Sequence, residues 1–174
     1  AHLGGGITIA LHQQGRITDL VGDDEGPMSP ERAGGLPTSL LVRMCYSGEY
    51  DHPFMERRIK GSGGFKAYFG TADAKEVERR ALSGEPEAAL VYDALCYQVA
   101  KGIAGLAAAA CGRVDGVLLT GGLAYSEEIC ARIRRRVEFI APVQAYPGEN
   151  EMQALAEGAL RVLRGEEQPH IFTE

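Results

Sequence analysis

The amino-acid sequence predicts an α/β domain built on a mixed sheet that is flanked by helices. Two segments of strand-like composition, residues 7–12 and 16–21, are separated by a Gln-Gln-Gly turn and indicate an antiparallel hairpin. The second half of the chain alternates between helical and strand patterns, which is typical of a sheet covered by helices. Between these two parts, residues 39–85 are mostly helical, and we interpret them as an insertion.

Local signals subdivide the first half of the chain after the hairpin. Residues 22–37 are rich in glycine, proline and acids, which predicts a loop. The helical pattern over residues 39–60 is broken near Gly48 and again at Pro53. A second glycine-rich loop follows at residues 61–64.

The helices of the second half have recognisable ends. Asp73 is the expected N-cap of a helix that runs to about residue 82, with Glu76 completing a capping box. A long helix over residues 86–110 ends before Gly112, a residue suited to the C′ position. The remaining expected elements are a strand at 114–120, a helix at 126–136, a strand at 143–146 and a helix at 151–164. This order matches a ribonuclease-H-like α/β core.

Composition and charge narrow the class of protein. The net charge of −6 gives no support to a nucleic-acid-binding face. The four cysteines lie far apart without a C-x-x-C pair, which favours reduced thiols in a cytoplasmic protein over a zinc site or disulfides. The most apolar stretch, residues 88–111, contains Asp93 and Lys101, so we expect a buried helix and no membrane span. The chain opens at Ala1 without a methionine, and we expect that a segment precedes it.

The first candidate site is the glycine run near the start of the chain. Gly4, Gly5 and Gly6 stand beside a strand and can present backbone N–H groups to one anion, because no Cβ blocks its approach. His2 and Thr8 add a ring nitrogen and a hydroxyl. A glycine triplet alone is weak evidence, and a plain glycine-lined turn is the alternative.

The second candidate is the segment over residues 118–126. An apolar strand runs directly into Gly121 and Gly122 and then into a helix, which places N–H groups at the carboxyl end of a strand. No Lys-Ser/Thr follows the glycines, so this is not a P-loop, and the G-x-G-x-x-G fingerprint is incomplete. A simple strand-to-helix turn explains the pattern equally well.

Two further positions carry charge. Arg32 is a lone cation in the loop over residues 29–37, where it could meet phosphate oxygens bidentately or pair with a neighbouring glutamate. Glu149 and Glu151 at the start of the last helix could hold Mg²⁺ through waters, or serve as favourable acids in the first turn.

Taken in chain order, these segments resemble the acetokinase family, within the actin-like and hexokinase-like ATPase superfamily, and its butyrate branch in particular. Residues 2–8 resemble the second phosphate motif of the family, and Gly5 stands where acetate kinases usually carry asparagine. Residues 31–37 are similar to the segment whose arginine stabilises the transferring phosphoryl group. Residues 120–126 resemble the adenosine motif, and residues 69–75 the segment that contacts the nucleoside. The resemblance covers nearly the whole chain.

The resemblance implies a role for each of these residues. Arg32 and His2 are the expected catalytic residues. The expected nucleotide contacts are Gly4, Gly5, Gly6, Thr8, Asp73, Lys75, Thr120, Gly121, Gly122, Leu123 and Ala124. Lys75 stands where the family generally has arginine. The carboxylate associated with Mg²⁺ is expected at Glu149 or Glu151, because Asn150 stands at the family's acidic position.

The implied reaction is the reversible phosphorylation of a short-chain, butyrate-like fatty acid by ATP with Mg²⁺, giving an acyl phosphate and ADP. Residues 1–174 would be the C-terminal nucleotide-binding domain of a two-domain cytoplasmic kinase that forms a homo-oligomer. The N-terminal domain, which would carry much of the carboxylate pocket, is absent, so we expect the isolated chain to have negligible activity. The alternatives are a Rossmann-like dinucleotide-binding domain of a dehydrogenase and a non-catalytic regulatory module with an actin-like fold.

Overall fold

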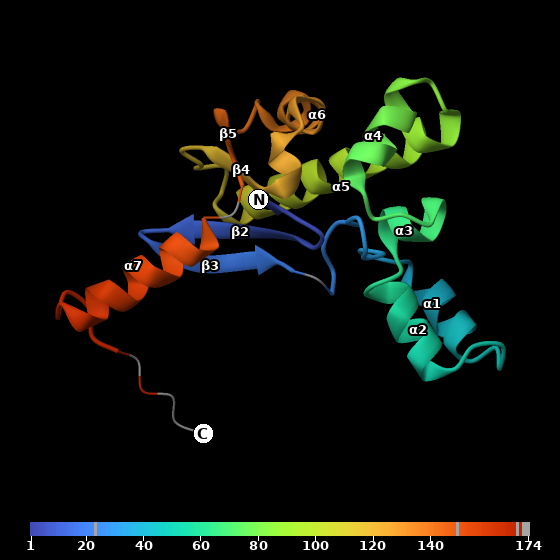
Figure 1. Ribbon diagram of the computed structural model, residues 1–174, viewed down its shortest axis with the longest axis horizontal. Helices are drawn as coiled ribbons and strands as arrows, with labels where there is room; N and C mark the ends of the chain where they lie inside the picture. Colours follow the sequence, from blue (N-terminus) through green and yellow to red (C-terminus); the bar gives the residue numbers. More distant parts are fainter. Residues whose placement is uncertain (23, 149, 170, 172–174) are drawn as a thin grey trace.

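The predicted mixed sheet is present in the computed structural model, which describes residues 1–22, 24–148, 150–169 and 171. Within these residues, five strands form one sheet in the order β3-β2-β1-β4-β5 (Figure 1). The strands are β1 (His2–Leu3), β2 (Ile7–Gln13), β3 (Arg16–Val21), β4 (Val117–Gly121) and β5 (Val143–Pro147). The first three pair antiparallel, whereas β1 with β4 and β4 with β5 pair parallel. The α/β fold class predicted from the sequence is therefore confirmed.

Strand β1 was not expected from the sequence. It has only two residues and runs into three glycines, so it shows no alternating pattern that could have revealed it. Its strand conformation is defined by pairing on both sides, because His2 lies opposite Thr8 of β2 and opposite Thr120 of β4. This short strand joins the N-terminal hairpin to the parallel pair formed by β4 and β5.

The expected helical insertion contains four helices. They are α1 (Thr38–Cys45), α2 (His52–Ile59), α3 (Gly64–Phe69) and α4 (Ala74–Leu82). Pro53 does not break a helix, as the sequence suggested, but stands in the first turn of α2 behind the N-cap Asp51. Proline is well tolerated there because the first N–H groups of a helix have no intrahelical partner.

The hydrophobic core lies between one face of the sheet and two later helices, α5 (Pro86–Ala109) and α6 (Glu127–Val137). Helix α5 packs against β2 and β3 as well as α4 and α6. Its end is the predicted glycine cap, where Gly112 has a φ of +72° and its N–H donates to the carbonyl of Ala107 at 2.8 Å. The largest fully buried side chains are Tyr92, Phe65, Leu3, Ile7, Leu95, Leu119, Ile129 and Ile133.

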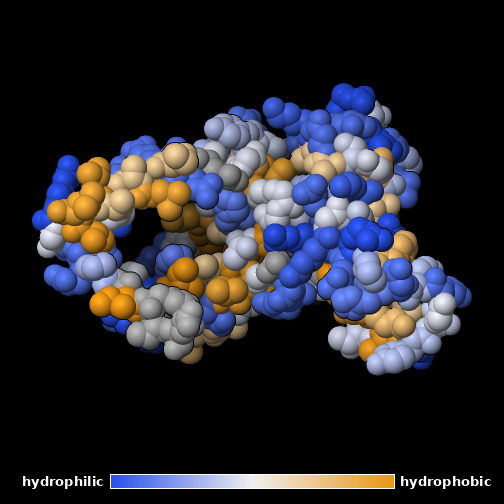
Figure 2. All heavy atoms as spheres, turned by 60° about the horizontal axis from the view of Figure 1, so that its bottom comes forward, coloured by the Kyte–Doolittle hydropathy of each residue, from blue (hydrophilic) through white to orange (hydrophobic). Residues whose placement is uncertain are grey.

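The other face of the sheet is open around β4. Val117 and Leu119 are buried, whereas Leu118 between them is 53% exposed. The last helix, α7 (Glu151–Leu163), has no buried residue, and its apolar side chains Met152, Leu155 and Leu163 are exposed. In Figure 2, apolar surface gathers on the side of the molecule where Figure 1 places α7 and the β2–β3 hairpin.

None of the helices in the described part of the chain is both long enough and apolar enough to span a membrane.

Candidate functional site

The glycine run and the strand-Gly-Gly turn meet at one edge of the sheet. Because β1 and β4 are parallel, the residues that follow them emerge at the same edge. Gly121 has a φ of +90°, and a Cβ at this position would lie 2.6 Å from the carbonyl oxygen of Leu3. The two motifs are thus in contact through a backbone approach that only glycine allows.

The glycine run is a tight turn on which Arg32 rests. The N–H of Gly4 donates to the carbonyl of Gly6 at 3.0 Å, which closes the turn between β1 and β2. A Cβ at Gly6 would lie 2.5 Å from Cζ of Arg32 and 2.6 Å from its Nη1, so the guanidinium lies directly against this glycine. The structure therefore brings together two segments that the sequence singled out separately.

The loop that carries Arg32 is held by the insertion. Arg32 forms an isolated bridge with Lys60, and the N–H of Ala33 donates to the carbonyl of Ile59 at 2.9 Å. The N–H groups of Gly61 and Gly63 both donate to the carbonyl of Glu31, at 2.8 and 3.0 Å. The second glycine-rich loop, to which the sequence assigned no function, thus supports the arginine loop.

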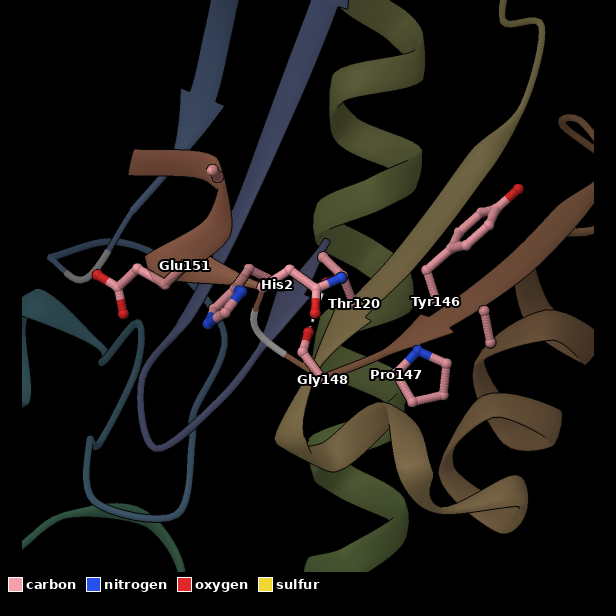
Figure 3. Close-up of a pocket in the computed structure, with 9 residues that line it drawn as sticks. His2, Thr120, Tyr146, Pro147, Gly148 and Glu151 are labelled. Atoms are coloured by element: carbon pink, nitrogen blue, oxygen red, sulfur yellow. Dashed lines mark hydrogen bonds between the residues drawn. The ribbon is translucent and has the colours of Figure 1, made fainter. Parts of the chain in front are cut away.

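An open pocket of about 710 Å³ lies at this edge, between β1, β4, β5 and the start of α7 (Figure 3). Figure 3 shows His2 between Glu151 and Thr120, with the ring of Tyr146 directed away from them. The hydroxyl of Thr120 donates to the carbonyl of Gly148 at 3.2 Å, and Gly121 and Gly148 exchange two backbone hydrogen bonds of 3.1 Å. The ends of β4 and β5 are thus tied together beneath the pocket.

The connection from β4 to α6 is a single 3₁₀ turn, η1 (Gly122–Tyr125). Gly122 is exposed, and a Cβ added at this residue would have no atom within 4 Å. Ala124 is buried in the core, and Leu123 is partly buried against it. The predicted strand, glycine pair and helix are all present, with this turn inserted before the helix.

The start of α6 is anchored through a buried polar cluster. The hydroxyl of Ser126, the N-cap, accepts from the N–H of Ile129 at 3.1 Å and donates to the carboxylate of Glu78 on α4. Tyr92, fully buried on α5, donates to the same carboxylate, and burial raises the pKa of its hydroxyl. The cluster fixes the end of the η1 turn relative to α4 and α5.

Asp73 and Lys75 lie away from this pocket. They stand at the start of α4, which Figure 1 places apart from β4 and β5, and both are exposed. The Asp73 carboxylate is the predicted N-cap, accepting from the N–H groups of Lys75 at 2.9 Å and Glu76 at 3.4 Å. The reciprocal half of the capping box is absent, because the N–H of Asp73 donates to the hydroxyl of Thr71. The expected contact of these two residues with a nucleoside stays a prediction.

The described residues supply one of the two expected metal ligands. Glu151 lines the pocket in the first turn of α7, whereas Glu149 lies outside the described residues. Within the described chain, no group of three imidazole, thiol or carboxylate side chains could hold a metal ion. A single carboxylate such as Glu151 is the kind of protein ligand that Mg²⁺ takes together with waters and substrate oxygens.

The two remaining expected residues, Gly5 and Thr8, do not line this pocket. Gly5 is exposed in the glycine turn, and Thr8 is half-buried beside His2 and lines a neighbouring cavity of about 1070 Å³ between β2 and β4. Reasoning from the sequence missed Tyr146 and Pro147, which line the pocket, and Ser29, which touches the glycine turn. Ser29 stands in the same segment as Arg32, but only the cation gave a signal.

No protein-family model matches the sequence. Three solved structures are similar to the chain. Acetate kinase from Porphyromonas gingivalis matches 93% of the chain and 48% of its own length, with a TM-score of 0.82 and 21% identity. A propionate kinase from Francisella tularensis matches 87% of the chain and 46% of its own, with a TM-score of 0.77 and 18% identity. Acetate kinase from Entamoeba histolytica matches 91% of the chain and 50% of its own length, with a TM-score of 0.78 and 17% identity.

The chain thus spans about half the length of the solved structures that it matches. At these identities the likeness shows the fold alone: the five-stranded mixed sheet and its flanking helices are arranged as in an acetate kinase domain. The similarity in fold agrees with the resemblance in motifs.

Proposed function

We propose that this chain is the C-terminal, nucleotide-binding half of a carboxylate kinase that transfers the γ-phosphoryl group of ATP to a short-chain, butyrate-like fatty acid. The observation that carries the proposal is the contact between the Arg32 guanidinium and Gly6, beside the edge where β1 and β4 both end. This contact brings together a glycine turn and a cation, and enzymes that transfer phosphoryl groups use backbone donors and positive charge of this kind to hold and stabilise the transferring group.

The turn at Gly4 to Gly6 fits a polyphosphate. The Arg32 guanidinium lies against Gly6, in the space that a side chain at this residue would fill, and it presents donors in a planar fork that matches phosphate oxygens. His2 and Thr120 line the adjoining pocket and add polar groups on the same edge. A phosphate at the turn would therefore meet backbone N–H groups and positive charge together.

The proposed reaction needs little covalent chemistry from the protein. A carboxylate oxygen of the acid forms a bond to the γ-phosphorus while the bond from phosphorus to the β–γ bridging oxygen breaks, and ADP leaves. Arg32 would neutralise charge on the oxygens of the transferring group. Such an arginine contributes about 10³–10⁵ in rate where it has been measured in other phosphoryl-transfer enzymes.

Magnesium fits this site as an ion bound chiefly by substrate. Mg²⁺ usually keeps several waters and takes one or two protein carboxylates together with phosphate oxygens. Glu151 is the described carboxylate at the pocket, and Glu149 is the other candidate from the sequence. When bound, the ion would offset charge on the β- and γ-phosphates.

The finer parts of the proposal come from the sequence. Gly5, where acetate kinases usually carry asparagine, supports a butyrate-like acid as the acceptor. The match to about half of each kinase supports a second domain in the parent protein, with the carboxylate pocket mostly on that domain. The exposed apolar side chains of α1 and α7 support further assembly, with that domain or with a second copy.

The test is acyl phosphate formation by the complete parent polypeptide. Butyrate, ATP and Mg²⁺ are supplied, and the product is trapped with hydroxylamine and quantified as the hydroxamate. We expect butyrate-dependent product, a loss of about 10³-fold or more in Arg32→Ala, and near-normal turnover in Arg58→Ala, a matched change at an exposed arginine on α2. A parent that binds nucleotide but forms no acyl phosphate from any short-chain acid would instead favour the regulatory module.

The dehydrogenase alternative is not favoured by the fold. A Rossmann domain is built on an open, mostly parallel sheet, whereas β1, β2 and β3 of this chain pair antiparallel.

A further inference from the structure

The glycine turn and the arginine loop are joined by one buried hydroxyl group. Ser29 is fully buried, with no exposed surface. Its Oγ donates to the carbonyl of Gly5 at 2.6 Å and accepts from the N–H of Arg32 at 3.1 Å. One side chain therefore makes a hydrogen bond to each of the two segments.

The loop is also closed upon itself at this point. The backbone N–H of Ser29 donates to the carbonyl of Arg32 at 3.1 Å, which closes the loop between these two residues. A serine hydroxyl that accepts from the N–H three residues later is a local side-chain to backbone bond that adds to this closure. The backbone of Arg32 is thus tied to Ser29 by two hydrogen bonds.

Gly63 and Gly64 also lie close against the loop. A Cβ at Gly64 would lie 1.6 Å from the carbonyl oxygen of Ser29, and Gly64 has a φ of +53°. A Cβ at Gly63 would lie 2.3 Å from the backbone nitrogen of Ala33. The arginine loop is therefore in close contact with both the glycine turn and the Gly63–Gly64 pair.

The burial of the Ser29 hydroxyl indicates a role beyond filling space. A hydroxyl taken out of water costs free energy unless it is hydrogen-bonded, and alanine would fill nearly the same space without that cost. The two bonds of Ser29 satisfy the group, and both of them lead to the proposed phosphate-binding elements. The hydroxyl therefore links the two elements as well as filling space in the core.

We propose that Ser29 is a positioning residue, whose hydroxyl fixes the Arg32 loop on the glycine turn so that the guanidinium stays against Gly6. The proposal rests on the proposed function for its catalytic meaning, since Arg32 is the group that would face the transferring phosphate. Without the hydroxyl, the backbone at Arg32 loses its tie to Gly5, and the guanidinium samples positions away from the turn. Misplacement of a catalytic group by about 1 Å can lower a rate by about 10²-fold.

The first experiment measures the order of the Arg32 side chain in the 174-residue chain by NMR, without nucleotide. The Nε–H signal of Arg32 is assigned by its loss in Arg32→Lys, and its heteronuclear NOE is compared with that of the exposed Arg57 and Arg58. We expect an ordered signal in the wild type and a mobile one in Ser29→Ala. The matched control is Ile133→Ala, which removes a fully buried side chain from α6 and should leave Arg32 ordered.

An unchanged Arg32 signal in folded Ser29→Ala overturns the proposal, and so does equal loss of order in Ile133→Ala. If Ser29→Ala does not fold, Ser29→Cys keeps the volume with a weaker donor and is judged by the same signal. This readout requires no ligand, so it stays decisive even if the chain binds no nucleotide and the proposed function fails.

The second experiment is a double-mutant cycle in the parent enzyme, measured as turnover. Ser29→Ala should lower kcat by about 10–100-fold, and it should cause no further loss in an Arg32→Ala background, because Ser29 acts through Arg32. Additive losses in the double variant would mean that Ser29 affects the fold generally, and they would overturn the positioning role.

Discussion

Replacing Gly121 by alanine tests the close approach of β4 to β1 at the edge of the sheet. Gly121 has φ and ψ of +90° and 177°, a region that is essentially restricted to glycine. The added Cβ would also lie 2.6 Å from the carbonyl oxygen of Leu3 and 2.8 Å from its nitrogen and carbonyl carbon. These are backbone atoms, so β1 itself would have to move.

The magnitude follows from these two effects. A residue held in such a backbone region costs about 1–3 kcal/mol. Displacing β1 also breaks the hydrogen bond of 2.9 Å from the N–H of Thr120 to the carbonyl of Ala1, which is worth about 1 kcal/mol. We therefore expect Gly121→Ala to lower the free energy of unfolding by about 2–4 kcal/mol.

The assay is urea denaturation followed by circular dichroism. With an m-value of about 2 kcal/mol/M, the midpoint should fall by about 1–2 M. The control is Gly122→Ala at the next residue, where the new Cβ meets no atom within 4 Å and the free energy of unfolding should stay within about 0.5 kcal/mol of the wild type. Equal midpoints for the two variants would refute the close packing of β1 against β4.

Two further predictions concern the role of Asp73 and the cysteines. Asp73→Ala should lower the free energy of unfolding by about 1 kcal/mol, because it removes the N-cap of α4, whereas Asp73→Asn keeps a capping side chain and should be near neutral; equal urea midpoints for the two variants would exclude the capping role. A thiol reagent at pH 8 should modify two cysteines of the folded chain and spare two, because burial raises the pKa of Cys96 to about 12 and also raises that of Cys130. Mass spectrometry of the labelled protein checks this, and rapid labelling of either buried thiol would contradict the packing of α5 and α6. The reactive pair is Cys45 and Cys111.

The regular elements could be predicted from the sequence because each carries its own signal. The hairpin has two segments of strand-like composition around Gln14 and Gly15, both of which adopt positive φ in the structure. The long helix α5 has a proline in its first turn and a left-handed glycine at Gly112, and both signals are local. The order of the elements was then enough to indicate the fold class.

The elements that the sequence missed depend on tertiary contacts. Strand β1 is defined by its partners on both sides, and nothing in two residues predicts such pairing. Helix α3 begins at Gly64, a poor helix former, because any side chain there would collide with the carbonyl of Ser29. The ion pairs between α5 and α6 also depend on tertiary contacts, because Arg132 and Arg136 of α6 pair with Asp93 of α5 at 3.3 and 2.8 Å.

The candidate site was predicted as a set of segments but not as an arrangement. Glycine runs and a lone arginine are visible in the sequence, so Gly6, Arg32 and Thr120 could be named. Their contacts could not, because the sheet order that brings them together involves pairing across more than one hundred residues, from His2 to Thr120. Ser29 gave no signal because a single serine beside a proline is typical of any loop.

The central claim is that this edge of the sheet binds a nucleotide through Gly6 and Arg32. The most direct measurement is isothermal titration of the 174-residue chain with ADP and with NADH, repeated on Gly6→Ala. The added methyl must displace the Arg32 guanidinium, a flexible side-chain end, so the fold should persist while affinity for ADP falls about 10–100-fold. Gly105→Ala, which places a methyl in open space on α5, is the matched control. ADP binding that is lost in Gly6→Ala and kept in Gly105→Ala is the result we predict; a preference for NADH, or ADP binding that Gly6→Ala leaves unchanged, would contradict the account.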